Sequence, residues 1–265
     1  MNPILQSVAH RPWPLPRGPW VMAQTWNNLL FAHWPVPVAQ LRSLVPNLLH
    51  IDTFNGEAWV AVTPFSIGNL RARFLPPLPP FSSFPELNVR TYVKVEDKPG
   101  VFFFSLDAGS LAAVMGARAL YFLPYFHARM RIRVGADQIH YSSRRMRGRE
   151  ARFEARYAPT SPSRNPEPGT LQHWLVERYC LYTVMGGALY RAEIHHSPWP
   201  LHDARVDIAE NSMAQAAGID LPETAALAHF AQKLRVYVWP LHRVTASVQA
   251  FQPKTSTVQV AIKPV

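Results

Sequence analysis

The stretch Phe84–Val93, with the sequence FPELNVRTYV, carries an acid, an amide and a guanidinium at alternating positions. On a β-strand, Glu86, Asn88 and Arg90 point to one face, because successive side chains of a strand alternate between its two faces. Two opposite charges and an amide on one face pack poorly in an apolar core but form a good polar wall. The stretch therefore predicts a strand that lines a polar pocket.

The composition predicts a folded protein built mainly from short strands. Of the 265 residues, 48% are hydrophobic and 17% are charged, which argues against disorder. The 26 prolines are about twice the usual share of roughly 5%, and they disfavour long helices. We expect one mostly antiparallel β domain over residues 1–265, with an extended arm at 1–19 and a tail at 245–265.

The chain shows no sign of export or membrane insertion. It has no run of about 18 apolar residues that would predict a transmembrane helix. Its N-terminus lacks the charged start and apolar centre of a signal peptide. The single cysteine, Cys180, cannot form an internal disulfide, and we expect it to be a buried, inert thiol. These features predict a cytoplasmic protein without a membrane partner.

Turn and cap residues predict the individual elements. Asn55-Gly56 predicts a hairpin between strands at Ile51–Phe54 and Ala58–Phe65. Helices are expected at Pro37–Val45, at Ser110–Leu120 and at Thr170–Tyr179. The string ERYCLYT is also expected to be helical. The other expected strands are Trp20–Trp34, Leu87–Val95, Val101–Leu106, Phe126–Val134, Gln138–Met146, Glu150–Tyr157, Ala188–His195, Ala204–Ser212 and Lys233–Trp239.

The net charge of +10 is densest in the segment Arg129–Arg156, which contains nine arginines and three acids. Arginines at 129, 131 and 133 alternate with apolar residues, which predicts a half-buried strand with a basic solvent face. Such a face suits an anionic partner. However, no helix-turn-helix, zinc-finger or RNP-type signature accompanies it, which favours a solvated face over a nucleic-acid site.

Several motifs together resemble one bacterial family. The strings FPELNVRTYV, PGVFFFSLDA, ARALYFLPYFHARM, ERYCLYT and IHHSPWPL closely resemble the YqjF-type proteins, a family of uncharacterised function, over about residues 18–244. More distantly, PRGP at Pro16–Pro19 and LRSLVPNLLHID at Leu41–Asp52 resemble segments of acetoacetate decarboxylase. The distant resemblance implies a closed, cone-like antiparallel barrel with a few short helices, a central pocket and assembly into homo-oligomers.

The same resemblance implies roles for single residues. Glu86 falls on the pocket glutamate of the decarboxylase, and Thr25 falls where that family has a substrate-binding arginine. Tyr125 replaces the Schiff-base lysine, and Phe126 replaces the neighbouring lysine that lowers its pKa. Because a tyrosine cannot form an imine with a ketone, the sequence argues against a Schiff-base decarboxylase. We expect no cofactor.

These arguments select a small set of candidate residues. Glu86 and Tyr125 are the candidate catalytic pair, and Tyr125 would need a lowered pKa for fast proton transfer. The alternative for Glu86 is an ion pair with Arg90 that sets strand register, and for Tyr125 an aromatic that fills the space of a lysine. The candidate ligand-binding residues are Asn88, Arg90, His127 and Thr25, with Arg90 able to grip a carboxylate bidentately.

The sequence supports two functions from different classes. The first is binding of a small polar or carbonyl-bearing molecule in a central pocket, with lyase, hydratase or isomerase chemistry through Glu86 and Tyr125 if the protein is an enzyme. The second is a non-catalytic interaction module that uses the basic face Arg129–Arg156. A metal site is not expected, because His195 and His196 are adjacent on a strand and no HExxH spacing is present.

Overall fold

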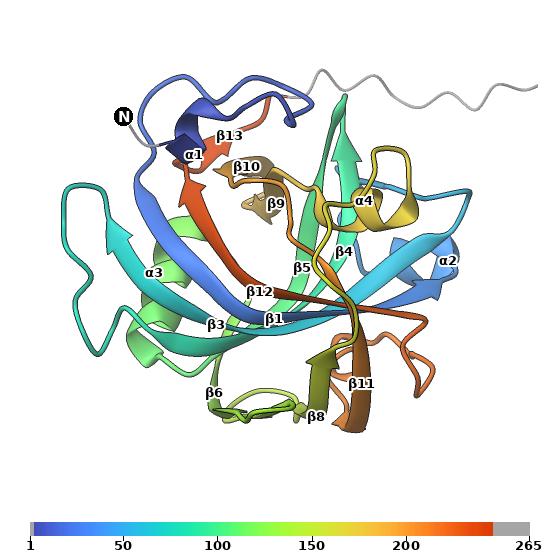
Figure 1. Cartoon of the computed structure of the whole chain (residues 1–265). Coiled ribbons are helices and arrows are strands. Elements are labelled where there is room, and N and C mark those ends of the chain that lie inside the picture. The colour runs from blue at the N-terminus through green and yellow to red at the C-terminus, as the bar shows by residue number, and fades with distance from the viewer. Residues whose placement is uncertain (1–2, 246–265) are drawn as a thin grey trace, which may run out of the picture.

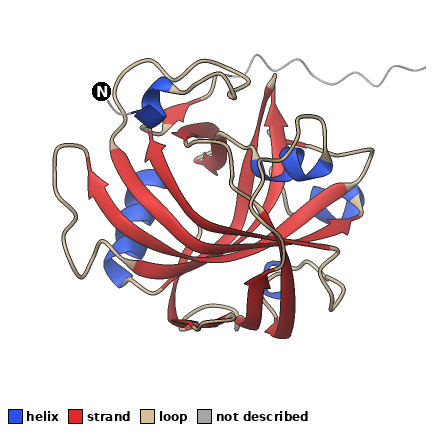
Figure 2. Ribbon diagram, viewed as in Figure 1, coloured by secondary structure: helices blue, strands red, loops and turns tan. Residues whose placement is uncertain are grey.

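Strand β4 (Phe84–Val95), which contains the stretch FPELNVRTYV, lies inside a large sheet between two antiparallel neighbours. The computed structural model describes residues 3–245, so all but the first residue of the predicted tail lies outside the described residues. Strands dominate the molecule, and short helices lie at its edges (Figure 2). The neighbours of β4 are β3 (Ala58–Ala72) and β5 (Lys98–Ala108).

Seven strands pair in a ring and form the wall of the barrel that the resemblance predicts. The ring runs β1–β3–β4–β5–β9–β10–β12 and returns to β1. Two of its contacts, β5–β9 and β10–β12, are short ladders of only two residue pairs each. The mainly β fold class is confirmed, but the barrel is not strictly closed at these two places. The remaining strands of the ring are β1 (Met22–Val36), β9 (Cys180–Met185), β10 (Ala188–His195) and β12 (Leu227–Val238).

Four further strands cover the outer face of β1, β3 and β4. They continue the sheet from β5 round to β12 and lie below β1 and β3 in Figure 1, whereas β9 and β10 lie above. Each side has its own buried core. Leu87 and Val89 of β4 pack in the outer core, whereas Phe84 packs on the barrel side. The four strands are β6 (Tyr125–Val134), β7 (Ile139–Arg145), β8 (Arg152–Pro159) and β11 (His202–Asn211).

The longest helix, α3 (Leu111–Tyr121), begins where the sequence predicts. Ser110 caps it, because its Oγ accepts a hydrogen bond of 3.3 Å from the backbone N–H of Ala113. No helix within residues 3–245 has the length and apolarity needed to cross a membrane. The shorter elements are α1 (Pro3–Gln6), α2 (Val38–Arg42), α4 (Leu171–Val176), a 3-10 turn (Gln215–Ala217), β2 (His50–Ile51) and β13 (His242–Arg243).

Two local predictions are wrong. Helix α4 ends at Val176, and most of ERYCLYT forms strand β9, because pairing with β5 and β10 satisfies its backbone and buries its aromatic residues. Asn55 and Gly56 do have the positive φ angles, 52° and 85°, of a tight hairpin turn. However, this turn closes only the single bridge Phe54–Glu57. Strand β2 pairs with β4, so the predicted hairpin between β2 and β3 does not form.

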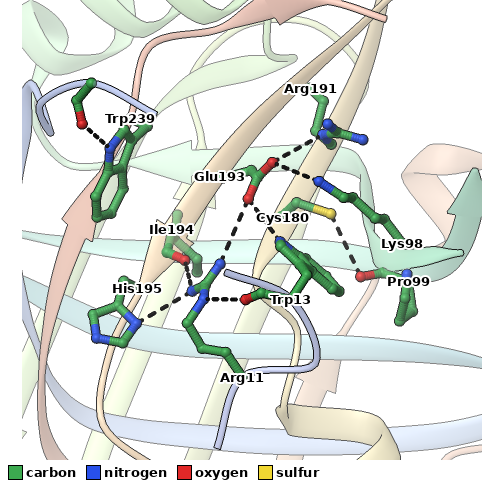
Figure 3. A network of polar contacts seen from close by, with 11 residues as sticks. Arg11, Trp13, Lys98, Pro99, Cys180, Arg191, Glu193, Ile194, His195 and Trp239 are labelled. Carbon is green, nitrogen blue, oxygen red and sulfur yellow. Dashed lines mark hydrogen bonds and ion pairs between the residues drawn. The ribbon is translucent and has the colours of Figure 1, made fainter. Parts of the chain in front are cut away.

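The predicted arm at 1–19 is not simply extended, since it contains α1 and folds back onto β10 (Figure 3). Arg11 is buried, and its Nη1 donates a hydrogen bond of 2.7 Å to the carbonyl of Ile194. Trp13 donates from Nε1 to Oε2 of Glu193 at 2.8 Å, and Nζ of Lys98 lies 3.3 Å from the other oxygen of Glu193. The arm therefore covers the barrel strands at β10.

Candidate ligand-binding site

A cavity of about 270 Å³ lies on the barrel side of β4. Its wall includes Glu86, Asn88 and Arg90, all of which are buried, as the alternation of the stretch predicts. Most of the remaining wall is apolar or aromatic, which is typical of small-molecule sites with a few placed polar groups. Tyr125, at the start of β6, also lines the cavity. The structure thus brings together four of the six predicted site residues.

Glu86 is held by Tyr125. The phenol of Tyr125 donates a hydrogen bond of 3.0 Å to Oε2 of Glu86. Burial raises the pKa of Glu86 to about 8, with the charge of Asp107 adding to the shift and the Tyr125 hydrogen bond opposing it. At neutral pH the Glu86 side chain is therefore mainly a neutral carboxylic acid. In this state it can donate a hydrogen bond as well as accept one.

Tyr125 does not have the electrostatics of a proton-transfer residue. Burial, together with the neighbouring carboxyl group of Glu86, raises the pKa of Tyr125 well above its usual value. Fast proton transfer near neutral pH would need the opposite shift. In this site the phenol stays protonated and orients Glu86, whose own pKa is much closer to neutral.

Arg90 is a buried cation without a counterion. Only 8% of the residue is exposed, and its Nε has no hydrogen-bond partner. Its guanidinium lies over the rings of Phe31 and Tyr92, 5.2 Å and 5.9 Å from their centroids. Among the residues that the structure describes, no carboxylate forms an ion pair with Arg90. The Glu86–Arg90 ion pair, the alternative considered for these residues, is therefore not formed.

Further unpartnered polar atoms lie beside Arg90 on the cavity wall. Asn88 and Thr63 face each other across the β3–β4 ladder, and both line the cavity. The Oδ1 atom of Asn88 and the Oγ1 atom of Thr63 are buried without hydrogen-bond partners. Buried polar atoms are rarely left unpaired in native proteins, so each needs an explanation. A ligand oxygen could accept from Nε of Arg90 and from the Thr63 hydroxyl, whereas Oδ1 of Asn88 would need a ligand group that donates.

Arg178 is a second buried guanidinium at the cavity. Its Nη1 lies 2.6 Å from Oδ2 of Asp52, and its guanidinium stacks 4.2 Å from the ring centroid of Trp174. Its Nη2 is buried without a partner. The adjacent Cys180 also lines the cavity, but burial raises the pKa of its thiol to about 12. Cys180 is thus an inert wall residue, as expected.

The structure places two predicted residues elsewhere. Thr25 is buried, but its neighbours Gln24 and Trp26 line the cavity, and Thr25 is not among the lining residues. His127 is half-buried on β6 and pairs with Ala108 of β5. It is also absent from the cavity wall, because β6 pairs with β5 over only three residues and then continues into the outer strands.

His195 and the neighbouring Glu193 have partners other than a metal ion. Glu193 is held by the arm and by Lys98, and Nδ1 of His195 lies 3.3 Å from Nη1 of Arg11. Within residues 3–245, no three histidine, cysteine, aspartate or glutamate side chains cluster in a way that could hold a metal ion.

Comparison with known proteins places the chain among uncharacterised relatives. A family model named DUF2071 and described as an uncharacterised conserved protein matches residues 23–235. The chain is also 50% identical over 229 residues to the uncharacterised protein YqjF of Bacillus subtilis strain 168. That alignment covers 86% of this chain and 95% of YqjF.

Solved structures with a similar fold are enzymes of low sequence identity. The enduracididine biosynthesis enzyme MppR complexed with pyruvate superposes with a TM-score of 0.63 at 13% identity, covering 89% of this chain and 94% of MppR. Acetoacetate decarboxylase from Legionella pneumophila superposes with a TM-score of 0.60 at 13% identity, covering 92% of this chain and 96% of the decarboxylase. These similarities show a shared acetoacetate-decarboxylase-like fold.

Proposed function

This chain belongs to the DUF2071 family of uncharacterised conserved proteins, and from its cavity we propose that it binds a small molecule with a carboxylate or carbonyl group. The observation that carries the proposal is Arg90, a buried guanidinium that lines the cavity without a counterion. An uncompensated charge is costly to bury, and an anionic ligand would offset that cost. Arginine suits this role, because its planar fork matches a carboxylate bidentately.

The residues around Arg90 support a ligand with more than one polar group. On the same wall Thr63 offers an unpartnered hydroxyl that can donate to a ligand oxygen, and Asn88 offers an unpartnered amide oxygen that can accept from a ligand hydroxyl. The neutral acid form of Glu86, held by Tyr125, can donate a hydrogen bond to a carbonyl oxygen. Pyruvate, which is bound in the structurally similar enzyme MppR, has both a carboxylate and a carbonyl, and belongs to the class of ligand proposed here.

If the protein turns its ligand over, acid–base chemistry fits the site better than covalent catalysis. Glu86 has a pKa near 8, which suits proton exchange with a substrate close to neutral pH. Among the described residues that line the cavity there is no lysine, so that wall offers no amine for an imine. We therefore propose a lyase, hydratase or isomerase reaction through Glu86, with Tyr125 as its positioning residue.

A second candidate function rests on the outer face of β6 and β7. Arg129 and Arg144 face each other across these strands, and both are exposed. Glu150 interacts electrostatically with Arg144, but neither arginine has a described carboxylate within ion-pair distance, and directly opposed like charges destabilise a sheet. A polyanionic partner would relieve this repulsion. To test this function, the protein is titrated with generic DNA and RNA at several salt concentrations. Binding that does not weaken with salt would exclude this function.

The proposed pocket is tested by calorimetric titration with pyruvate, acetoacetate and butyrate. Arg90→Gln keeps a polar side chain but removes the cation, so we expect affinity for these anions to fall at least tenfold. Arg133→Gln is the matched control, because Arg133 is exposed on β6 outside the cavity. Equal affinities of the wild type and Arg90→Gln would show that Arg90 does not hold the carboxylate.

A further inference from the structure

One face of α3 forms a wall of the cavity. The residues that line it are Ala113, Gly116, Ala117, Leu120 and Tyr121, and their spacing of three, four, seven and eight residues describes one helix face. Three of the five side chains are a methyl group or a hydrogen atom. The helix therefore bounds the cavity without filling it.

The cavity wall changes from polar to apolar along the strands. The β3–β4 register places Thr63 opposite Asn88, Phe65 opposite Glu86 and Ile67 opposite Phe84. Starting from Arg90, the wall thus passes an amide and a carboxyl group and then reaches aromatic and aliphatic side chains. Further along β3, Leu70 also lines the cavity. One end of the cavity can pair a charged group, and the end beyond Phe84 can bury only apolar atoms.

Gly116 borders unfilled space. A Cβ atom added to Gly116 would meet no atom within 4 Å, although this residue is only half-exposed and lines the cavity. The contrast with Gly100 is clear, because a Cβ atom there would lie 2.7 Å from the carbonyl oxygen of Cys180. The absence of a side chain at Gly116 therefore leaves volume free, whereas at Gly100 it allows close packing.

We propose that the ligand is an amphipathic carboxylic acid, with its carboxylate at Arg90 and an apolar tail of several carbons against α3. Gly116 is the residue that sets the tail length the cavity accepts. This inference rests on the proposed binding function and adds the class of ligand to it. Water finds few hydrogen-bond partners against an apolar wall. A hydrocarbon tail is therefore the occupant that such a wall favours.

The test uses straight-chain carboxylates from butyrate to decanoate, titrated against the wild type and three α3 variants. Trp26 and Trp199 line the cavity, so tryptophan fluorescence reports occupancy alongside calorimetry. Gly116→Val and Gly116→Phe fill the free space in two steps. Ala119→Phe is the matched control, because Ala119 lies on the exposed side of the same helix.

For the wild type we expect each added methylene to tighten binding about fourfold until the tail space is full. The increase of affinity with chain length should stop at a shorter chain in Gly116→Val and at a still shorter one in Gly116→Phe. Ala119→Phe should follow the wild type. The smaller substitution keeps the test valid if Gly116→Phe does not fold.

The outcomes separate this inference from the proposed function. If affinity does not depend on chain length, or if the limiting length is the same in the Gly116 variants, the tail site is wrong. Binding of pyruvate and butyrate that still depends on Arg90 would leave the proposed function standing in that case. If no carboxylate binds in an Arg90-dependent way, both the proposed function and the tail site are wrong.

Discussion

The phenol of Tyr125 donates a hydrogen bond of 3.0 Å to Oε2 of Glu86 at the polar wall of the cavity. The hydrogen bond from the neutral phenol only partly opposes the effect of burial on the pKa of Glu86. The tyrosine therefore leaves Glu86 mainly protonated at neutral pH. This pair gives the pocket a hydrogen-bond donor at Glu86.

Replacing Tyr125 with phenylalanine should raise the pKa of Glu86 above about 8, because the lost hydrogen bond is the one interaction that opposes burial. It should also cost about 1–3 kcal/mol of stability, since a buried carboxyl oxygen loses its partner. NMR titration of the Glu86 carboxyl carbon measures the first effect. Tyr190→Phe on β10, outside the cavity wall, is the control. An unchanged or lower pKa of Glu86 would contradict the assignment.

The contribution of Glu86 to the stability of the protein should fall as pH rises toward the pKa of its folded state. The folded pKa, about 8, is above the ordinary value of 4.5, so the folded state holds a proton that the unfolded state has already lost. This contribution is complete below about pH 4.5 and is lost as pH approaches 8, which corresponds to about 3 kcal/mol between pH 5 and pH 8.

Urea unfolding at several pH values measures this effect. Glu86→Gln should remove the decline that Glu86 contributes between pH 5 and pH 8, because glutamine does not titrate, whereas the buried histidines titrate alike in both proteins. Glu57→Gln, at an exposed position in the turn before β3, should leave the decline unchanged. A Glu86→Gln variant that loses stability as steeply as the wild type would show that Glu86 is ionised in the folded protein.

Binding of a carboxylate should weaken above about pH 8. Deprotonation of Glu86 places a negative charge on the same wall as the ligand anion, and the two charges then repel. Calorimetric titration of butyrate between pH 6 and pH 9.5 should show this loss in the wild type, whereas Glu86→Gln should bind equally at both ends of the range. A similar loss in the variant would assign the pH dependence to another group.

The Asp52–Arg178 pair should be important for stability. Only 3% of the Arg178 side chain and 16% of the Asp52 side chain are exposed. Asp52→Asn would leave the guanidinium buried without its counterion, which typically costs about 3–5 kcal/mol. The exposed pair Arg164–Asp203 supplies the control, since Asp203→Asn should cost no more than about 1 kcal/mol. Similar losses in the two variants, measured by urea unfolding, would contradict this difference.

Local features of the sequence predicted much of the site. The placement of Glu86, Asn88 and Arg90 on one wall follows from strand alternation, which depends only on backbone geometry. The Ser110 cap of α3 is similarly local, since the interaction spans three residues. The string ERYCLYT was mispredicted because its partners, β5 and β10, are distant or later in the sequence. Its strand state depends on these pairings and not on its own residues.

Thr25 and Arg178 show what depended on the tertiary structure. The resemblance points to Thr25, but only the β1 register shows that Gln24 and Trp26, on the other face, line the cavity. Arg178 reaches the cavity because its ion pair with Asp52 joins segments 126 residues apart. The sequence alone determined the polar strand face, because alternation along a strand depends only on the residues and their spacing. The tertiary structure decided that Arg90 is buried without a counterion and that Gly116 borders free space, because both depend on which distant side chains fill the barrel.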